Sequence, residues 1–402
     1  MHWNVYWNNK IRICGDEMMA QKRVPLGKFI REYSVRNKAD ADIPVYSVTN
    51  SQGFCREYFG KEVASKDKTT YKIVPYGYFA YNPSRINVGS VDWQRCEEQV
   101  IVSPLYNVFF VTEGLNQQFL FYFLKSNIGK QIIRAKASGS VRDNLKLEML
   151  KEITIPDIPV DEQAHCADIL DSVQRLISSR KQQLAELDNL VKARFVEMFG
   201  DMLINPLHWP EQRLETVAEI VSGITKGRKI QTTELHDVPY MAVSNVKDGY
   251  IDWTTVKTIA ASQMEIEQYR LLPDDVLMTE GGDPDKLGRG AIIHNPPKNC
   301  IHQNHIFRVR LNQEHVLPEF MEQYLQHQRA KRYFLGCAKQ TTGIASINMT
   351  QLRALPMLMP PMGLQKQFAA FVEQTDKSKA AVQKALDEAQ TLFDSLMHQY
   401  FG

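Results

Sequence analysis

An internal repeat constrains the fold of this chain more than any other feature. Residues 162–200 align without a gap with residues 364–402 at a constant offset of 202, and seven of the 39 pairs are identical. A chain repeated in this way contains two copies of one structural unit. Upstream of these segments, matching features recur in the same order in both copies: 44–50 with 239–245, Tyr71 with Tyr269, Phe119 with Phe320, and Asn144 with Asn348. The offset in residue number between the copies rises slowly from 195 to 204, as small loop insertions would cause.

Each copy ends in a segment with the period of a long amphipathic helix. Apolar residues recur every three or four positions over 169–198 and again over 371–396. Neither segment contains Gly or Pro, so each helix can run for about 35 residues, or roughly 50 Å. Such a helix can lie along its own domain or pair with the other copy. Two copies with matching stripes favour an antiparallel coiled coil, with Leu386 and Leu392 in the apolar seam.

The segments before the two helices differ from them in pattern. Residues 24–160 and 211–362 alternate short β-rich runs with Gly, Pro, Asn and Asp turns, which is typical of mixed α/β domains. Each also contains one amphipathic helix, over 115–135 and 318–335.

The predicted fold class is therefore α+β, with two tandem mixed α/β domains, two long helices and an internal pseudo-two-fold repeat. Its predicted parts are an extension without a counterpart (1–23), the first domain (24–160), the first long helix (161–200), a linker (201–210), the second domain (211–362) and the second long helix (363–402).

Charge and cysteine content limit the classes of function. The 48 Lys and Arg nearly balance 46 Asp and Glu, so bulk charge gives no argument for a nucleic-acid or membrane partner. Residues 1–157 are more basic, with 22 basic and 16 acidic groups. Six cysteines without a CxxC pair indicate free thiols in a reducing cytoplasm. The N-terminus lacks the apolar run of a signal peptide, and prolines interrupt the apolar stretch at 355–361, so we expect no secretion and no membrane association.

Motifs that suggest catalysis are incomplete. The segment NPPK at 295–298 resembles the catalytic loop of amino-methyltransferases, but lysine replaces the aromatic residue that stacks on a flipped base. The glycine-rich segment 280–290 matches neither a phosphate loop nor a dinucleotide fingerprint and predicts a backbone turn. Cys300, His302 and His305 have no distant partner pair, which favours a strand edge over a zinc site. We therefore expect a binding protein with no catalytic residue, metal or cofactor of its own.

Three stretches carry a resemblance to a known family. They are VKARFVEMFGDMLINPLHWPEQRLETVAEI at 191–220, EGGDPDKLGRG at 280–290, and the helical tail at 364–402. Together with the duplicated plan, they resemble the specificity subunits of type I restriction-modification systems from about residue 24 onward. The resemblance implies a non-catalytic reader of double-stranded DNA, whose two target recognition domains each read half of a bipartite, asymmetric sequence.

The resemblance also implies partners. Two methyltransferase subunits would carry S-adenosylmethionine and modify adenine, and two motor-nuclease subunits would use ATP and Mg. A helical pair of roughly 50 Å would hold the two domain centres about 15 base pairs apart. The alternative is an orphan DNA-binding protein or the recognition subunit of a type II-like restriction-modification enzyme. Neighbouring genes for a methyltransferase and a helicase-nuclease would distinguish these possibilities.

Basic residues in turn-rich segments are the predicted DNA contacts, because lysine and arginine bind phosphates and arginine can also contact guanine through two hydrogen bonds. They are Arg36, Lys38, Arg85 and Arg142 in the first domain and Lys226, Arg228, Lys229 and Arg289 in the second. The repeated Asn50 and Asn245 can read adenine, although an Asn that closes a strand is more often a turn residue.

Some apolar residues of the long helices are predicted to lie outside the seam, where they would bind the methyltransferase subunits. They are Leu170, Leu190, Val372 and Phe393.

Overall fold

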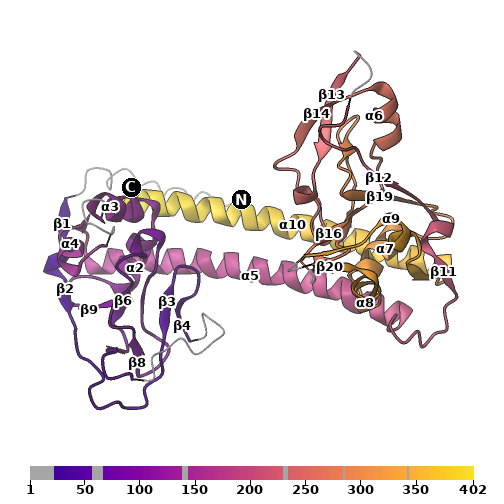
Figure 1. Ribbon diagram of the computed structural model, residues 1–402. Coiled ribbons are helices and arrows are strands. Elements are labelled where there is room, and N and C mark those ends of the chain that lie inside the picture. The colour runs from indigo at the N-terminus through magenta and orange to yellow at the C-terminus, as the bar shows by residue number, and fades with distance from the viewer. Residues whose placement is uncertain (1–21, 57–66, 138–143, 230–233, 284–285, 342–343) are drawn as a thin grey trace, which may run out of the picture. The chain divides into compact units, whose positions relative to one another are not determined.

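The chain divides into two compact units. The computed structural model describes residues 22–56, 67–137, 144–229, 234–283, 286–341 and 344–402, so nearly all of the predicted extension lies outside the described residues (Figure 1). Unit 1 comprises Met1–Lys181 and Lys384–Gly402, and unit 2 comprises Gln182–Gln383. Each unit therefore contains one mixed α/β domain and a part of each long helix.

The first domain consists of short strands and helices. Its elements in chain order are β1 (Arg23–Pro25), η1 (Leu26–Lys28), β2 (Ile30–Glu32), β3 (Ser47–Thr49), β4 (Gly53–Cys55), β5 (Lys72–Pro75), β6 (Phe79–Tyr81), η2 (Ile86–Val88), β7 (Val91–Trp93), β8 (Gln99–Val102), β9 (Asn107–Val111), α2 (Gln117–Lys125), α3 (Asn127–Ala137), α4 (Leu147–Lys151) and β10 (Thr154–Pro156).

The second domain repeats this plan. Its elements are β11 (Glu211–Arg213), η3 (Leu214–Thr216), β12 (Ala218–Ser222), β13 (His236–Met241), η4 (Val243–Asn245), β14 (Lys257–Ala261), α6 (Gln263–Tyr269), β15 (Val276–Thr279), β16 (Gly281–Gly282), β17 (Gly290–Ile292), β18 (Ile301–His302), β19 (Ile306–Leu311), α7 (Pro318–Gln326), α8 (Gln328–Cys337), β20 (Lys339–Thr341), β21 (Ile344–Ser346), α9 (Met349–Arg353) and β22 (Pro356–Leu358).

The two domains share their central topology. A four-stranded sheet has the order β2-β9-β6-β7 in the first domain and β12-β19-β15-β17 in the second. In each domain a two-stranded antiparallel ladder joins the first strand to the last, β1 to β10 and β11 to β22. The sequence repeat is therefore also a repeat of strand order.

The structure corrects the prediction of one amphipathic helix in each domain. The first is two helices, α2 and α3, because Ser126 has extended backbone angles and its Oγ accepts a hydrogen bond from Gly129 N at 2.9 Å. In the second domain the break falls at His327, whose Nδ1 accepts from Arg329 N at 3.2 Å. Both side chains cap the new helix, which is the ordinary way to satisfy its first free N–H groups.

The two long helices are α5 (Val160–Phe199) and α10 (Met362–Phe401). Within unit 2, the end of α5 packs against the start of α10. The rings of Phe195 and Phe199 each lie 5.5 Å from the Phe368 ring, and Asp188 pairs with Lys379 at 2.8 Å. Residues later in α5 contact residues earlier in α10, so the two segments run antiparallel.

Each long helix ends in the core of the domain that it does not follow. Phe199, the last residue of α5, packs on Phe320 of α7 at 5.0 Å between ring centroids. Phe401, the last residue of α10, packs on Phe119 of α2 at the same distance. Phe199 and Phe401 are an identical pair of the repeat, and both are fully buried.

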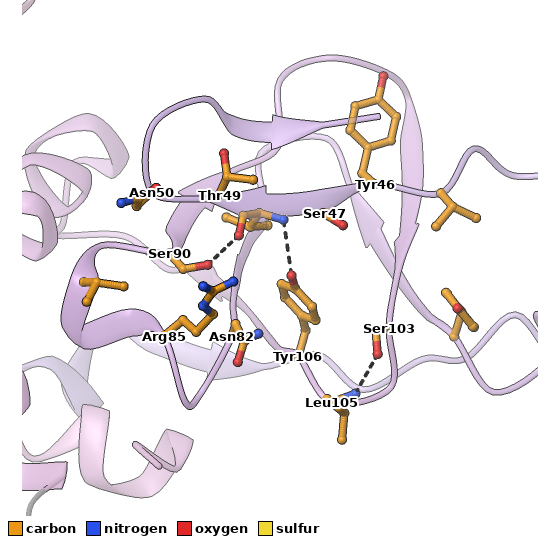
Figure 2. Close-up of a pocket in the computed structure, with 14 residues that line it drawn as sticks. Tyr46, Ser47, Thr49, Asn50, Asn82, Arg85, Ser90, Ser103, Leu105 and Tyr106 are labelled. Atoms are coloured by element: carbon orange, nitrogen blue, oxygen red, sulfur yellow. Dashed lines mark hydrogen bonds between the residues drawn. The ribbon is translucent and has the colours of Figure 1, made fainter. Parts of the chain in front are cut away.

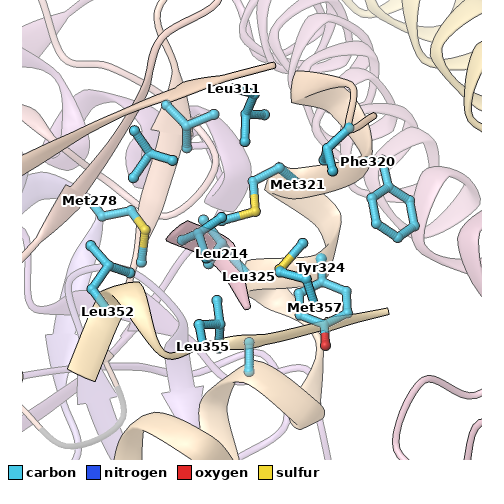
Figure 3. Packing of buried hydrophobic residues seen from close by; sticks show 14 of the residues in the cluster. Leu214, Met278, Leu311, Phe320, Met321, Tyr324, Leu325, Leu352, Leu355 and Met357 are labelled. Atoms are coloured by element: carbon cyan, nitrogen blue, oxygen red, sulfur yellow. The ribbon is translucent and has the colours of Figure 1, made fainter. Parts of the chain in front are cut away.

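The core of unit 2 forms between its four-stranded sheet, helix α7 and the closing ladder. Figure 3 shows Met278 and Leu311 from the sheet facing Met321 and Leu325 from α7. In the first domain, Phe79 and Phe109 stack on neighbouring strands at 4.9 Å. Such cores need alternating apolar residues on one sheet face, which short β-rich runs supply.

The apolar residues of the long helices are not distributed as the seam prediction required. Leu386 is 9% exposed, but Leu392 is 44% exposed, so the placement of Leu392 in the seam was wrong. Leu170 is fully buried, and the Phe393 ring lies 6.0 Å from that of Tyr122 in α2, so neither is an uncovered residue. Both residues belong to unit 1, where α2 packs on both long helices: Tyr122 donates to Asp171 of α5 at 2.5 Å, and Phe119 packs on Phe401 of α10.

Candidate nucleic-acid interface

Three loops of the first domain meet around a hollow of about 440 Å³. They are the turn after β3, the loop between β6 and β7, and the turn between β8 and β9. Figure 2 shows the side chains that these loops direct toward one region, from segments up to 60 residues apart in sequence. The hollow is lined by Val45, Tyr46, Ser47, Val48, Thr49, Asn50, Tyr71, Asn82, Arg85, Val88, Ser90, Ser103, Leu105 and Tyr106.

Buried hydrogen bonds hold the three loops together. The backbone of Val48 accepts a bond from the hydroxyl of Ser90 and donates one to the hydroxyl of Tyr106 at 3.4 Å (Figure 2). Lys125, at the end of α2, supports the first loop by donating to the carbonyl of Asn50 at 3.0 Å. Burial lowers the pKa of Lys125 to about 8. The walls of the hollow are thus fixed by the fold, while its polar lining remains accessible.

Arg85 is the predicted DNA contact that lies in this hollow. A turn positions it: Arg85 N donates to Asn82 O at 3.0 Å, and the Asn82 side chain in turn accepts from Ser84. Its side chain is exposed and makes no ion pair among the residues that the structure describes. An unpaired guanidinium beside two asparagines and several hydroxyls can donate to base edges and to phosphate oxygens.

The other predictions for the first domain have mixed outcomes. Arg36 and Lys38 are exposed in a turn adjoining the wall of the hollow, where Asn37 N donates to Tyr71 O at 2.9 Å. Neither makes an ion pair within the described ranges. Arg142 lies outside the described residues, so its predicted role remains a prediction.

The second domain contains the corresponding loops. In the antiparallel ladders, Tyr81 pairs with Val91 and Met278 pairs with Gly290, so the loops 82–90 and 279–289 occupy equivalent places. Each loop has a glycine two residues before the ladder resumes. Gly89 has φ +96° and Gly288 has φ +69°, a conformation that glycine adopts without strain. Arg289 directly follows Gly288 and, in the described part of this domain, has no carboxylate partner.

The lining side chains differ between the two copies. Leu105, in the first domain, corresponds to His305 in the second, because each stands two residues before paired positions of β9 and β19. His305 pairs with Glu280 at 2.5 Å. Asn50 is exposed, whereas the corresponding Asn245 is buried, with its side chain bonded to Ala242 N and Asp252 O at 2.9 Å. Asn245 is therefore a turn residue, which is the interpretation that the sequence pattern favoured over base reading.

The basic cluster at 226–229 also separates into two kinds of residue. Lys226 and Lys229 are exposed. Arg228 instead binds Glu265 through two hydrogen bonds, at 2.5 and 2.7 Å, and donates to Ala260 O at 3.0 Å. This guanidinium lowers the pKa of Glu265 to about 2. The prediction of Arg228 as a freely available DNA contact needs correction, because its Nε and Nη2 donors hold α6 to the loop.

The possible metal ligands form no site. Cys300 and His302 are fully buried, and the ring nitrogens of His302 lie 3.1 Å from Tyr269 O and 3.3 Å from Val221 O. Burial raises the pKa of Cys300 to about 12 and lowers that of His302 to about 4. His302 does lie at a strand edge, in β18 of the sheet β14-β13-β18, but the expectation of a polar surface was wrong for both residues, since tertiary packing covers them. Across the described ranges, no group of three His, Cys, Asp or Glu side chains is placed to hold a metal ion.

One further finding concerns the chain as a whole. No helix among the described residues is long and apolar enough to cross a bilayer.

Sequence reasoning missed the lining residues Asn82, Ser103 and Leu105. An alignment of Gly89 with Gly288 would have identified loop 82–90, which contains Asn82, as the counterpart of loop 280–290. No such signal identifies the turn at 103–106, because only the pairing of the strands brings it beside loop 82–90.

Comparison with known proteins gives consistent matches. A model of the type I restriction modification DNA specificity domain matches residues 27–189 and again 206–389. The type I restriction enzyme EcoKI specificity subunit of Escherichia coli strain K12 is 23% identical over 299 residues, which cover 70% of this chain and 64% of that protein. A putative type I restriction enzyme MjaX specificity subunit of Methanocaldococcus jannaschii is 25% identical over 198 residues, covering 49% and 46%. The matched regions thus span less than two thirds of these relatives.

Solved structures share the fold at low sequence identity. A chain described under complex assembly and conformational transition of the type I R-M system superposes with a TM-score of 0.58, 16% identity, and coverage of 95% of this chain and 97% of that one. The S subunit of a type I restriction-modification system from M. genitalium superposes with a TM-score of 0.54 and 13% identity, covering 95% and 96%. The fold of two tandem mixed domains with long helices is therefore one already seen in solved structures.

Proposed function

Because this chain belongs to the family of type I restriction modification DNA specificity domains, we propose that it is the sequence-reading subunit of a type I restriction-modification complex. Its two domains each read one half of a bipartite, asymmetric site in double-stranded DNA. The chain itself carries no catalytic residue, and partner subunits supply S-adenosylmethionine, ATP and Mg.

One observation carries this proposal: the same three-loop arrangement occurs once in each domain, with different side chains. Loop 82–90 presents an unpaired Arg85 beside Leu105, whereas loop 279–289 contains Arg289 and a Glu280 that pairs with His305. Equivalent loops with different donors, acceptors and apolar groups suit two half-sites of different sequence. Specificity arises from such contacts to base edges, while phosphate contacts position the protein.

Partner binding is proposed for the exposed apolar residues of the long helices. In unit 1 these are Val160, Leu176 and Leu392, and in unit 2 they are Leu190 and Val196. Exposed apolar side chains on a helix that is otherwise packed are typical of an interface. Since both units offer such residues, we propose one methyltransferase subunit beside each unit, two in all, with two motor-nuclease subunits joining the complex.

To test the reading role, the chain is co-purified with its methyltransferase partners, and binding of this complex to a random DNA library is measured. The complex is expected to select one bipartite sequence. Arg85→Ala should relax one base position and weaken specific binding by about 1–3 kcal/mol, whereas Lys226→Ala with Lys229→Ala should weaken binding to all sequences and lower the salt slope by about 2. Arg353→Ala, an exposed position in α9 outside these loops, is the control. Equal binding to selected and random DNA would refute the reading role.

The scaffold role is tested with two leucines of α10. Leu386→Asp buries a charge and should destabilise the chain, whereas Leu392→Asp should fold normally and lose one methyltransferase subunit on co-purification. Retention of both subunits by Leu392→Asp would contradict the interface. Methyl transfer from S-adenosylmethionine by the pure, isolated chain would contradict the non-catalytic role and favour a type II-like enzyme.

A further inference from the structure

The first domain displays an unusual apolar side chain among polar ones. Leu105 lies in the turn between β8 and β9 and is 77% exposed. The turn is closed by Tyr106 N donating to Ser103 O at 3.0 Å, and the Ser103 hydroxyl accepts from Leu105 N at 3.5 Å. Such turns ordinarily carry Gly, Asn, Asp or Ser at their exposed positions. A large apolar residue here gains nothing from the fold of the domain.

A second apolar side chain lines the same hollow. Val88, in η2 of the opposite loop, is 45% exposed. The lining also contains hydrogen-bonding groups, among them Asn50, Asn82, Arg85 and Ser103 (Figure 2), beside further apolar and aromatic residues such as Val45 and Tyr46. A ligand that fits this lining has an edge of donors and acceptors that is interrupted by one small apolar group.

The proposed function identifies the class of ligand. In the major groove of B-DNA, guanine, cytosine and adenine present only donors and acceptors, while thymine adds the C5-methyl group. The polar lining matches the donors and acceptors, and Leu105 with Val88 matches the methyl group. Arg85, in the same hollow, is placed to contact the neighbouring base or phosphate.

From this lining of the hollow, we propose that Leu105 and Val88 recognise the 5-methyl group of one thymine in the half-site read by the first domain. The inference rests on the proposed function as a DNA reader. The second domain carries His305 at the position of Leu105, paired with Glu280 at 2.5 Å, so it reads its equivalent position by hydrogen bonding. The methyl contact is therefore a property of the first domain alone.

Deoxyuridine provides the test, because it differs from thymidine by this methyl group only. The assembled complex is given its selected sequence with each thymine replaced, one at a time, by deoxyuridine. At one thymine of one half-site the wild type should bind roughly three- to tenfold more weakly, as expected for one lost buried methyl group and its packing. Leu105→Ala should bind the thymine and deoxyuridine forms equally at that position, and Val88→Ala should reduce the difference.

Leu207→Ala is the matched control. Leu207 is 48% exposed, lies in the 201–210 linker and does not line the hollow, so this variant should discriminate as the wild type does. The proposal is overturned if neither half-site contains a sensitive thymine, or if Leu105→Ala keeps the difference. It is also overturned if, relative to the wild type, Leu105→Ala weakens binding to the deoxyuridine form by as large a factor as to the thymine form, which would indicate insertion between base pairs. In all these cases selective binding to the bipartite sequence would persist, whereas failure of the proposed function would abolish it.

Discussion

At the scale of single residues, a buried glutamine explains one of the seven identities in the repeat. Gln163, in the first turn of α5, accepts from Asn116 N at 2.8 Å and donates to Ile158 O at 2.9 Å. Gln365, in the first turn of α10, accepts from Leu317 N at 3.0 Å and donates to Pro360 O at 2.9 Å. Each glutamine joins the start of a long helix to the N-cap residue of α2 or α7, which needs both the oxygen and the nitrogen of a primary amide; neither Glu nor Leu has both.

His302 shows how burial changes the chemistry of a residue. Its ring is enclosed between two backbone carbonyls, and a neutral imidazole can donate to only one of them. The protonated ring could donate to both, but burial and nearby Arg308 outweigh that gain, so the pKa falls from 6.5 to about 4. The folded chain therefore holds His302 neutral over most of the physiological range.

This shift predicts an acid-sensitive second domain. The pKa of His302 is lower in the folded chain than in the unfolded chain, so protons bind preferentially to the unfolded chain. The stabilisation is complete above about pH 6.5 and is lost as the pH falls toward 4, by on the order of 2 kcal/mol at pH 5. Urea unfolding at pH 7.5 and pH 5 measures it.

Two variants separate His302 from other titrating groups. His302→Gln should be less stable at pH 7.5 but should lose less stability between pH 7.5 and pH 5 than the wild type. His236→Asn, at an exposed position, should keep the wild-type pH dependence. An unchanged pH dependence in His302→Gln would show that other groups cause the acid sensitivity.

At the scale of elements, the break between α2 and α3 depends on a close approach of backbone atoms. A Cβ added at Gly129 would lie 2.0 Å from the carbonyl oxygen of Phe123. Ser126 caps α3 at the same place, by donating to Phe123 O at 2.7 Å and accepting from Gly129 N. Apolar periodicity continues through the break, which is why the sequence pattern predicted one helix.

Gly129→Ala should therefore destabilise the first domain, by about 2–4 kcal/mol, because the backbone must move to relieve the overlap. The matched change Gly336→Ala, in α8, meets no atom within 4 Å and should be neutral or stabilising by up to about 1 kcal/mol, the gain in helix propensity. Thermal unfolding of both variants measures the difference. Equal stability of the two would mean that the helix break tolerates a side chain at Gly129.

At the scale of the whole molecule, both long helices contribute to both units. Unit 1 includes α5 as far as Lys181 and α10 from Lys384, and unit 2 includes the remainder of each. Forty residues of α-helix extend for about 60 Å. If the helices set the separation of the two half-sites, their length should determine the spacing of the recognised bases.

A paired insertion tests this relation. Seven residues added between Lys181 and Gln182, and seven between Gln383 and Lys384, lengthen both helices by about 10 Å and nearly preserve their apolar faces. The complex should then methylate adenines that are about three base pairs farther apart, at 3.4 Å per base pair. Methylation-site sequencing reads the spacing directly. An insertion in one helix alone should disturb the packing of the two long helices and abolish DNA methylation by the complex. Unchanged spacing after the paired insertion would refute the idea that the helices set the separation of the two half-sites.

The sequence by itself determined the features that depend on local periodicity and on comparison of the two halves. The repeat, the mixed α/β class and the long helices follow from apolar spacing, since each element must bury one face. Short apolar β-rich runs such as Val276–Thr279 and Ile306–Leu311 are indeed strands, β15 and β19. Arg85 and Arg289 were chosen for their turn-rich surroundings, and they lie in equivalent loops.

Only the tertiary structure decided which side chains are available to a partner. Arg228 and Lys226 have similar local sequence, but Glu265 from a distant helix occupies the first and leaves the second exposed. Leu386 and Leu392 share one apolar stripe, yet only Leu386 is covered. Leu105 joins Arg85 around one hollow because strand pairing brings their loops together. Exposure and ion pairing depend on residues far apart in the chain, so no local pattern contains them.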